Sequence, residues 1–230
     1  MYANLESMFD LPASTIVDKP IPKNTFDEYA TPKQKKLFTN IVAKIKWANK
    51  LSLQTINLQG NEVQEIQIFK IELKEKSNIS ELLLLMNRVI PYPILFEIKH
   101  EEFLMYSISQ KHSHPTNENQ AVVDWTFTTE WKTQKESSFV LQLAHNLDFV
   151  FSEICFQISG KQSFKDRDVI KLIELEQKMK QLNLSVEKIT ASIKNCKQFN
   201  RKVELNRQLR ILMDEKNDLE RCEIENLTTD

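Results

Sequence analysis

The apolar and polar positions of residues 63–108 predict strand, helix, strand, turn and strand in succession. Residues 65–74 are rich in β-branched and aromatic side chains, and their second half alternates with period two, which is typical of a strand. Residues 77–80 supply a cap-type residue before a leucine-rich run, which predicts a helix. We expect Pro91 to end this helix, because proline disfavours helical geometry in the residue before it.

The second half of this segment predicts a hairpin. Residues 92–99 and 103–108 have strand composition, and the polar residues 100–102 form a turn between them. A strand, a helix of about three turns and another strand favour a right-handed crossover between parallel strands. The segment therefore predicts the body of a small α+β domain.

The N-terminal quarter predicts an irregular arm, a helix and a short strand. Residues 1–28 are spaced by prolines, so we expect them to lie across the surface of their own domain. Thr31 and Pro32 are suited to the cap and the first position of a helix, and an apolar stripe extends that helix to about Asn49. Residues 53–58 are interpreted as a strand that forms a hairpin with the strand beginning near Val63.

Past the central segment, residues 110–120 predict a polar loop, and residues 121–131 alternate as a half-buried antiparallel strand does. Residues 139–158 form a strongly apolar stretch that predicts a helix covering one face of the sheet, ended by Gly160. The loop holds His112 and His114, the only close histidine pair, but no cysteine or third histidine accompanies them. We therefore predict no metal site.

A heptad pattern dominates the C-terminal region and predicts a coiled coil. Apolar residues follow alternating spacings of three and four at Leu172, Leu175, Met179, Leu182, Val186, Ile189, Ile193 and Cys196. The pattern slips near residues 199–200 and resumes at Leu205, Leu209, Leu212, Lys216 and Leu219. The slip is compatible with one long helix of about 90 Å, at ~1.5 Å per residue, or with a helical hairpin. The first seven seam residues, Leu172 to Ile193, are the predicted partner-binding surface.

These elements together predict an α+β fold with a mixed or antiparallel sheet and packed helices, followed by the helical coiled coil or hairpin. The predicted boundaries are residues 1–160 for the α+β domain and 161–230 for the helical region. Basic and acidic residues nearly cancel at 31 and 32, so net charge indicates neither a nucleic-acid nor a membrane partner. Two glycines are too few for a phosphate-binding loop or a dinucleotide fingerprint, and we predict no cofactor.

Cysteine usage and the absence of an export signal favour a cytoplasmic protein. The three cysteines are far apart in sequence, and no C-x-x-C pair occurs. Residues 1–10 lack the basic start and apolar core of a signal peptide, and no apolar run reaches the ~20 residues that span a membrane.

Lysines concentrate in residues 31–50, where six occur without an acid. On a helix, such a row could face a phosphate backbone in a sequence-nonspecific DNA-binding module, with contacts from Lys33, Lys36 and Lys44. A solvated face balanced by acids elsewhere explains the same lysines. No helix-turn-helix pattern supports the first interpretation.

The sharpest enzymatic hypothesis uses Glu72 and Lys74, which form an E-x-K motif at the end of a strand. An acid and a lysine on one strand face, with an aspartate on the next strand, hold Mg²⁺ in PD-(D/E)XK nucleases. Here Asn57 stands where the aspartate is needed, and a second E-x-K at residues 97–99 shows how readily the motif arises. We therefore predict no catalytic residues, and keep a divergent nuclease as an alternative.

Five stretches together resemble a bacterial family catalogued as domain of unknown function 4391. They are MFDLP at 8–12, IKW at 45–47 with TINL at 55–58, IQIFKIEL at 66–73, IPYPILF at 90–96 and KQFNRKVELN at 197–206. The resemblance implies a genomic context beside DNA methyltransferase and helicase genes of restriction-type defence clusters, and it supplies no catalytic residues. The expected function is thus a non-catalytic accessory subunit of a DNA modification–restriction or phage-defence system. Its expected partner is a methyltransferase or helicase subunit, or a second copy bound through the coiled coil.

Overall fold

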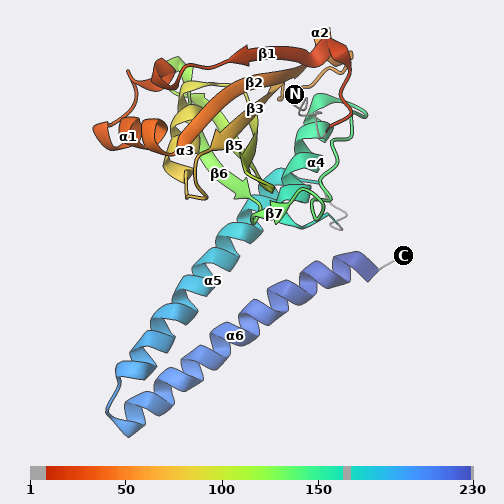
Figure 1. Ribbon diagram of the computed structural model, residues 1–230. Helices are drawn as coiled ribbons and strands as arrows, with labels where there is room; N and C mark the ends of the chain where they lie inside the picture. The colour runs from red at the N-terminus through yellow and green to blue at the C-terminus, as the bar shows by residue number, and fades with distance from the viewer. Residues whose placement is uncertain (1–8, 163–166, 229–230) are drawn as a thin grey trace. The chain divides into compact units, whose positions relative to one another are not determined.

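The computed structural model describes residues 9–162 and 167–228, which form an α+β unit and a helical unit (Figure 1). The chain divides into two compact units, Met1–Gln162 and Ser163–Asp230. Among the described residues, no helix is both long and apolar enough to cross a membrane.

The first unit is built on a mixed sheet of seven strands in which six follow the order of the chain. Neighbouring strands are antiparallel except for β3 and β4, which are parallel. The short β7 pairs with β5. The strands are β1 (Ile16–Pro20), β2 (Val42–Ser52), β3 (Glu65–Leu73), β4 (Ile94–His100), β5 (Phe103–His114), β6 (Asn117–Thr128) and β7 (Lys132–Thr133).

The crossover predicted from the sequence is confirmed. Helix α3 (Ser80–Val89) connects β3 to β4, and the two strands pair in parallel from Gln67–Ile94 to Glu72–Lys99. The Asn78 side chain accepts a hydrogen bond from the backbone N–H of Ser80 at 2.9 Å, at the start of the helix. The β4–β5 hairpin is also confirmed, with its turn at residues 101–102.

The helix predicted from Thr31 to Asn49 is less than half as long, and this prediction was wrong beyond Asn40. Helix α1 (Pro32–Asn40) begins as expected, with a capping box in which Thr31 and Gln34 exchange hydrogen bonds. From Val42 onward the chain is strand β2. The stripe that suggested a helix contains Ile45, which is buried in the core between sheet and helices, so pairing with β3 outweighs local propensity.

Two neighbouring predictions were also wrong. Residues 53–58 are not a strand; they contain the helical turn α2 (Leu53–Ile56), which ends at Asn57 in the left-handed region (φ 53°). The partner of β3 is therefore β2. The N-terminal arm is not irregular throughout, because it supplies the edge strand β1 between two short 3₁₀ turns, η1 (Ala13–Thr15) and η2 (Lys23–Phe26).

The predicted polar loop at residues 110–120 is a long β5–β6 hairpin, a further correction. Polar side chains pair across it, as in the 2.8 Å hydrogen bond between Ser109 Oγ and Thr126 Oγ1. Residues 110–120 are polar on both faces of the hairpin, so the alternation of apolar and polar residues that predicts a strand is weak there. The predicted alternation of the later part holds, with Phe127 buried and Asp124 exposed.

Helices cover both faces of the sheet. The main cluster packs α1 and α3 against alternate residues of β3 and β4, among them Phe69, Ile71 and Phe96. On the opposite face, α4 (Leu147–Ser159) contacts β3, β5 and β6. The helix predicted from residue 139 begins only at Leu147, capped by Asn146, and residues 139–146 are irregular; the predicted end is confirmed, with Gly160 left-handed at φ 75°.

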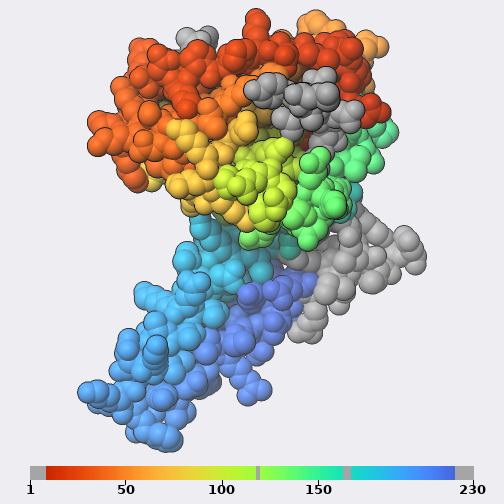
Figure 2. Space-filling view, viewed as in Figure 1, coloured from red at the N-terminus to blue at the C-terminus, as the bar shows by residue number. Residues whose placement is uncertain are grey.

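The second unit is a helical hairpin, which decides between the two interpretations of the heptad pattern. Helix α5 (Val169–Asn195) and α6 (Phe199–Thr228) are in contact, and residues 196–198 connect them. Figure 2 shows the two helices packed side by side. The predicted seam is buried or half-buried throughout, including Leu182 and Leu205 at 7% exposure, and the slip in the pattern marks the turn.

Candidate functional site

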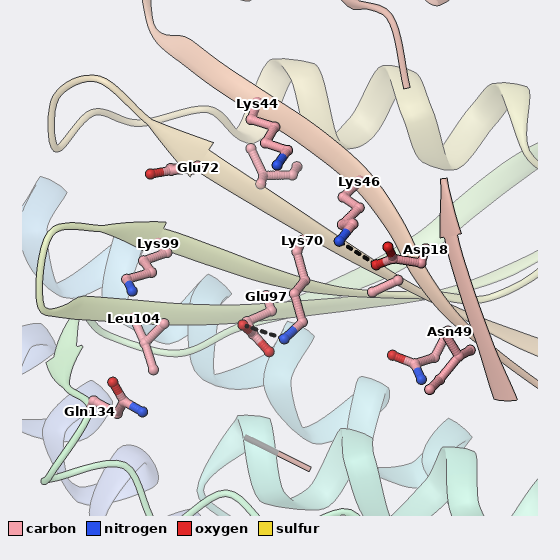
Figure 3. A pocket seen from close by; sticks show the side chains of 13 residues that line it. Asp18, Lys44, Lys46, Asn49, Lys70, Glu72, Glu97, Lys99, Leu104 and Gln134 are labelled. Atoms are coloured by element: carbon pink, nitrogen blue, oxygen red, sulfur yellow. Dashed lines mark ion pairs between the residues drawn. The ribbon is translucent and has the colours of Figure 1, made fainter. Parts of the chain in front are cut away.

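A pocket of about 260 Å³ opens on the sheet face between β1 and β5 (Figure 3). Its walls include the apolar residues Ile16, Ala48, Ile71 and Leu104, and the amides of Asn49 and Gln134. The rest of the lining is charged: Asp18, Lys44, Lys46, Lys70, Glu72, Glu97 and Lys99. Four lysines against three acids make this the most highly charged concave surface among the pockets of the described residues.

Strand register explains why residues distant in sequence meet here. Lys44 lies opposite Glu72, and Glu72 lies opposite Lys99, so one row of alternating charge crosses β2, β3 and β4. Because side chains alternate along a strand, the residues two positions away point to the same face and form a second row. That row is Lys46, Lys70 and Glu97, followed by Tyr106 on β5.

The second row places two lysines directly opposite each other, an arrangement that destabilises a sheet unless the charges are compensated. Each lysine has its own acid. Lys46 forms an ion pair with Asp18 of β1, and Lys70 Nζ lies 3.3 Å from Glu97 Oε1 of β4. Both pairs are drawn in Figure 3.

Shifts in the pairing register of β1 and β2 change the directions in which these side chains point. The β1–β2 register shifts between Ile16 and Lys19, where Asp18 adopts a left-handed backbone conformation (φ 56°). Two further shifts occur in β2, between Val42 and Lys44 and between Trp47 and Asn49. Bulges of this kind redirect side chains and are enriched beside functional sites.

Glu97 is the most buried charged group in the pocket, with only 9% of its side chain exposed. Its Oε1 pairs with Lys70, whereas its buried Oε2 has no hydrogen-bond partner. A buried polar atom without a partner costs about 1–3 kcal/mol, and more when it is charged. Burial raises the pKa of the neighbouring Tyr106, and the charge of Glu97 raises it further, although a hydrogen bond with Ser137 opposes the shift.

The two E-x-K residues named from the sequence do not act together in this pocket. Glu72 lines it, but its carboxylate points away from the Lys70–Glu97 pair in Figure 3. Lys74 lies beyond the end of β3, where its Nζ donates to the backbone carbonyl of Thr39 at 2.7 Å. This contact fastens the end of β3 to the end of α1, which is a structural role.

The three lysines named as phosphate contacts do not share a helix face, so that expectation was wrong. Lys33 and Lys36 lie on α1, and Lys33 Nζ is 2.7 Å from Glu81 Oε1 on α3. Lys44 lies on β2 and lines the pocket. The helix on which the three would have been aligned ends at Asn40.

Other candidates have ordinary surroundings. His112 Nδ1 lies 2.9 Å from Asp124 Oδ1 across the exposed side of the β5–β6 hairpin. Within the described residues, no group of three or more histidine, cysteine or acidic side chains could hold a metal ion. The seam residues of α5 face the interior of the hairpin or are half-buried, and their binding of another protein stays a prediction.

One lysine outside the pocket has an unusual environment. Burial lowers the pKa of Lys111 to about 7. Its Nζ donates to the carbonyls of Asn87 and Ile90 at 3.0 and 2.6 Å, at the C-terminal end of α3. Lys111 thereby donates hydrogen bonds to two of the carbonyls that a helix leaves unpaired at its C-terminal end.

The sequence interpretation missed five pocket residues, namely Asp18, Lys46, Lys70, Glu97 and Lys99. A signal was present: acid and lysine alternate with period two at residues 70–72 and again at 97–99. Only the strand register shows that these two motifs lie side by side and that β2 adds two more lysines.

The described residues thus define a mixed-sheet α+β protein with a charged pocket on its sheet and a helical hairpin after it. The chain belongs to the family described as Domain of unknown function (DUF4391), whose model matches residues 9–215, as the sequence resemblance indicated. No curated protein and no solved structure matches the chain.

Proposed function

We propose that the chain is a non-catalytic, cytoplasmic interaction subunit of a bacterial DNA modification–restriction or phage-defence system, and that its helical hairpin binds the partner protein. The observation that carries this proposal is the distribution of exposed apolar side chains. Six of the eleven large hydrophobic residues described as exposed lie on the hairpin helices: Ile170, Leu184, Phe199, Val203, Ile211 and Met213. The hairpin is the smaller unit, so this is a clear concentration.

The strongest part of this surface is the start of α6. Phe199 is 79% exposed, the highest value among these residues, and Val203 follows one turn later at 53%. Residues three or four apart lie on the same face of a helix, so the two form one apolar patch beside the hairpin turn. An exposed aromatic side chain with an aliphatic neighbour is a typical anchor for a partner protein.

The packing of the seam inside the hairpin supports partner binding by the outer surface. Because α5 and α6 use their heptad residues to pack against each other, the hairpin does not need a partner to bury its main apolar stripe. A partner bound at the turn would leave that packing intact. The expected partner remains a DNA methyltransferase or helicase subunit, because the family resemblance implies that genomic context.

The test is co-purification of the tagged chain with the methyltransferase and helicase proteins encoded beside its gene. We expect one of them to be retained by the parent and lost with Phe199→Asp and Val203→Asp. Leu53→Asp, which changes an apolar residue with 45% exposure in the other unit, is the matched control and should retain the partner. Far-UV circular dichroism should show parental helicity for these surface variants and for the control.

A further variant separates the surface from the seam. Leu182→Asp with Ile189→Asp puts charges into the interior of the hairpin, so both helicity and partner binding should fall. The proposal is wrong if neither neighbouring gene product co-purifies, or if the retained one binds the Phe199 and Val203 variants as well as the parent.

A further inference from the structure

Within the described residues, the charged pocket holds lysines that form no ion pair and a carboxylate oxygen that has no hydrogen-bond partner. Lys46 and Lys70 are neutralised by their ion pairs with Asp18 and Glu97. Within the part of the chain that the structure describes, Lys44 and Lys99 form no ion pair. Their ammonium groups are therefore available to an anion that enters the pocket.

The spacing of these two lysines suits a phosphate group. Lys44 and Lys99 stand on strands two apart, roughly 9–10 Å at the usual interstrand spacing, with Glu72 on the strand between them. Lysine side chains are flexible four-carbon stems with point charges at their ends, so both can reach one phosphate. The carboxylate of Glu72 points away from the Lys70–Glu97 pair (Figure 3), and its charge is a cost that the two lysines outweigh.

Glu97 adds a requirement for a hydrogen-bond donor. Its side chain lines the pocket, and its buried Oε2 has no hydrogen-bond partner, while Lys70 holds the carboxylate through Oε1. A ligand hydroxyl or amino group would satisfy this atom with a charge-assisted hydrogen bond, which is stronger than one between neutral groups. A simple anion would not need this feature.

We propose that this pocket binds a small phosphate monoester that also carries hydroxyl or amino donors, such as a mononucleotide or a sugar phosphate. Lys44 and Lys99 contact the phosphate, and Glu97 accepts a hydrogen bond from the rest of the molecule. The volume of about 260 Å³ lies just below the range of about 300–1,000 Å³ that is usual for small-molecule sites, so the ligand must be small. Nucleotides and sugar phosphates share the required chemistry.

Calorimetric titration of the full chain with adenosine 5′-monophosphate, ribose 5-phosphate, inorganic phosphate and adenosine tests the proposal. The two monoesters should bind, and adenosine should not. Similar affinity for both monoesters would identify the sugar phosphate as the recognised part, whereas tighter binding of the nucleotide would show that the base contributes. Binding of adenosine as tightly as its monophosphate, or of no monoester at millimolar concentration, would overturn the proposal.

Variants assign the roles of the residues. Lys99→Met and the exposed Lys44→Met should each weaken both monoesters about tenfold, equivalent to ~1.4 kcal/mol. Glu97→Gln keeps the shape of the side chain and should weaken ribose 5-phosphate more than inorganic phosphate. Unchanged affinity in both lysine variants would refute the site, even if Glu97→Gln does not fold.

Glu72→Gln distinguishes direct from metal-bridged binding. If the lysines contact phosphate directly, removing a nearby negative charge should leave affinity unchanged or raise it, with or without EDTA. If Glu72 held a divalent cation that bound the phosphate, affinity would fall in the variant and in EDTA, and the proposed lysine contacts would be wrong. Lys33→Met, which changes an exposed lysine of α1, serves as the charge-matched control and should have no effect.

Discussion

The Asp148 carboxylate fastens the segment that precedes β3, so replacing Asp148 with Asn should destabilise the first unit. Asp148 lies in the first turn of α4 and accepts backbone hydrogen bonds from Asn61, Glu62 and Val63 at 2.6, 3.0 and 2.8 Å. Three residues distant in sequence are thus held by one side chain. Partial burial opposes ionisation, but these hydrogen bonds outweigh it and lower the pKa of Asp148.

The expected loss in the free energy of unfolding follows from these hydrogen bonds. Hydrogen bonds to a charged group contribute about 1.5–3 kcal/mol each, against about 0.5–1.5 kcal/mol between neutral groups. Asparagine keeps one acceptor oxygen for Glu62 and Val63, but it loses the charge and turns an amide donor toward the N–H of Asn61. The bonds to Asn61 and Glu62 are exposed to water, which screens them, so we expect a total loss of about 2 kcal/mol.

Urea unfolding at pH 7 measures this loss, and its pH dependence identifies the cause. A carboxyl group whose pKa is lowered by folding stabilises above its unfolded pKa, and that stability disappears as the pH falls through the folded pKa. The parent should therefore lose stability below about pH 4, and Asp148→Asn should lose less over the same interval. Glu62→Gln is the control, because only the Glu62 backbone contacts Asp148. A variant within about 0.5 kcal/mol of the parent, or with the same acid profile, would refute the reasoning.

Two further predictions concern lysines. Burial lowers the pKa of Lys111 to about 7 from its ordinary 10.5, so between these values the unfolded chain binds a proton that the folded chain does not. The free energy of unfolding should therefore rise with pH across this interval. Lys111→Met should abolish the rise, which urea unfolding at a series of pH values would measure. The purified chain should not cleave supercoiled DNA with Mg²⁺ or Mn²⁺, because Lys74 is engaged by Thr39; cleavage lost in Glu72→Ala and Lys74→Ala would show the opposite.

The sequence predicted elements best where one periodicity was uncontested. The β3–α3–β4 crossover has a clear change from period two to a helical pattern, bounded by Asn78 and Pro91, and both helices of the hairpin have long heptad runs. The helix predicted over residues 41–49 was wrong because Ile45 and Ala48 fit a helical stripe and a bulged strand equally well. Hydrogen bonding to β3, a partner about twenty residues away, decided the outcome, and a local pattern cannot show it.

The pocket was harder to predict than the fold because it depends on register. A shift of one residue in the β3–β4 pairing would misalign Glu72 with Lys99 and Lys70 with Glu97. The bulges in β1 and β2 are equally invisible in the sequence, although they direct Asp18 and the lysines of β2 into the pocket. Single E-x-K or K-x-E motifs are common, whereas the K-x-E of residues 70–72 aligned with the E-x-K of residues 97–99 on a parallel neighbour is informative.

The hairpin surface and the sheet pocket rest on different units of the chain, so the two proposals can be judged separately. Phe199→Asp changes an exposed residue of α6 and should leave monoester affinity at the parental value. Lys99→Met changes a residue of β4 and should leave partner retention unchanged. If instead either variant altered both measurements, ligand and partner would be coupled through the protein, since thermodynamic linkage makes such an effect reciprocal. The pocket would then regulate assembly, and adding the monoester should change the fraction of partner retained by the parent.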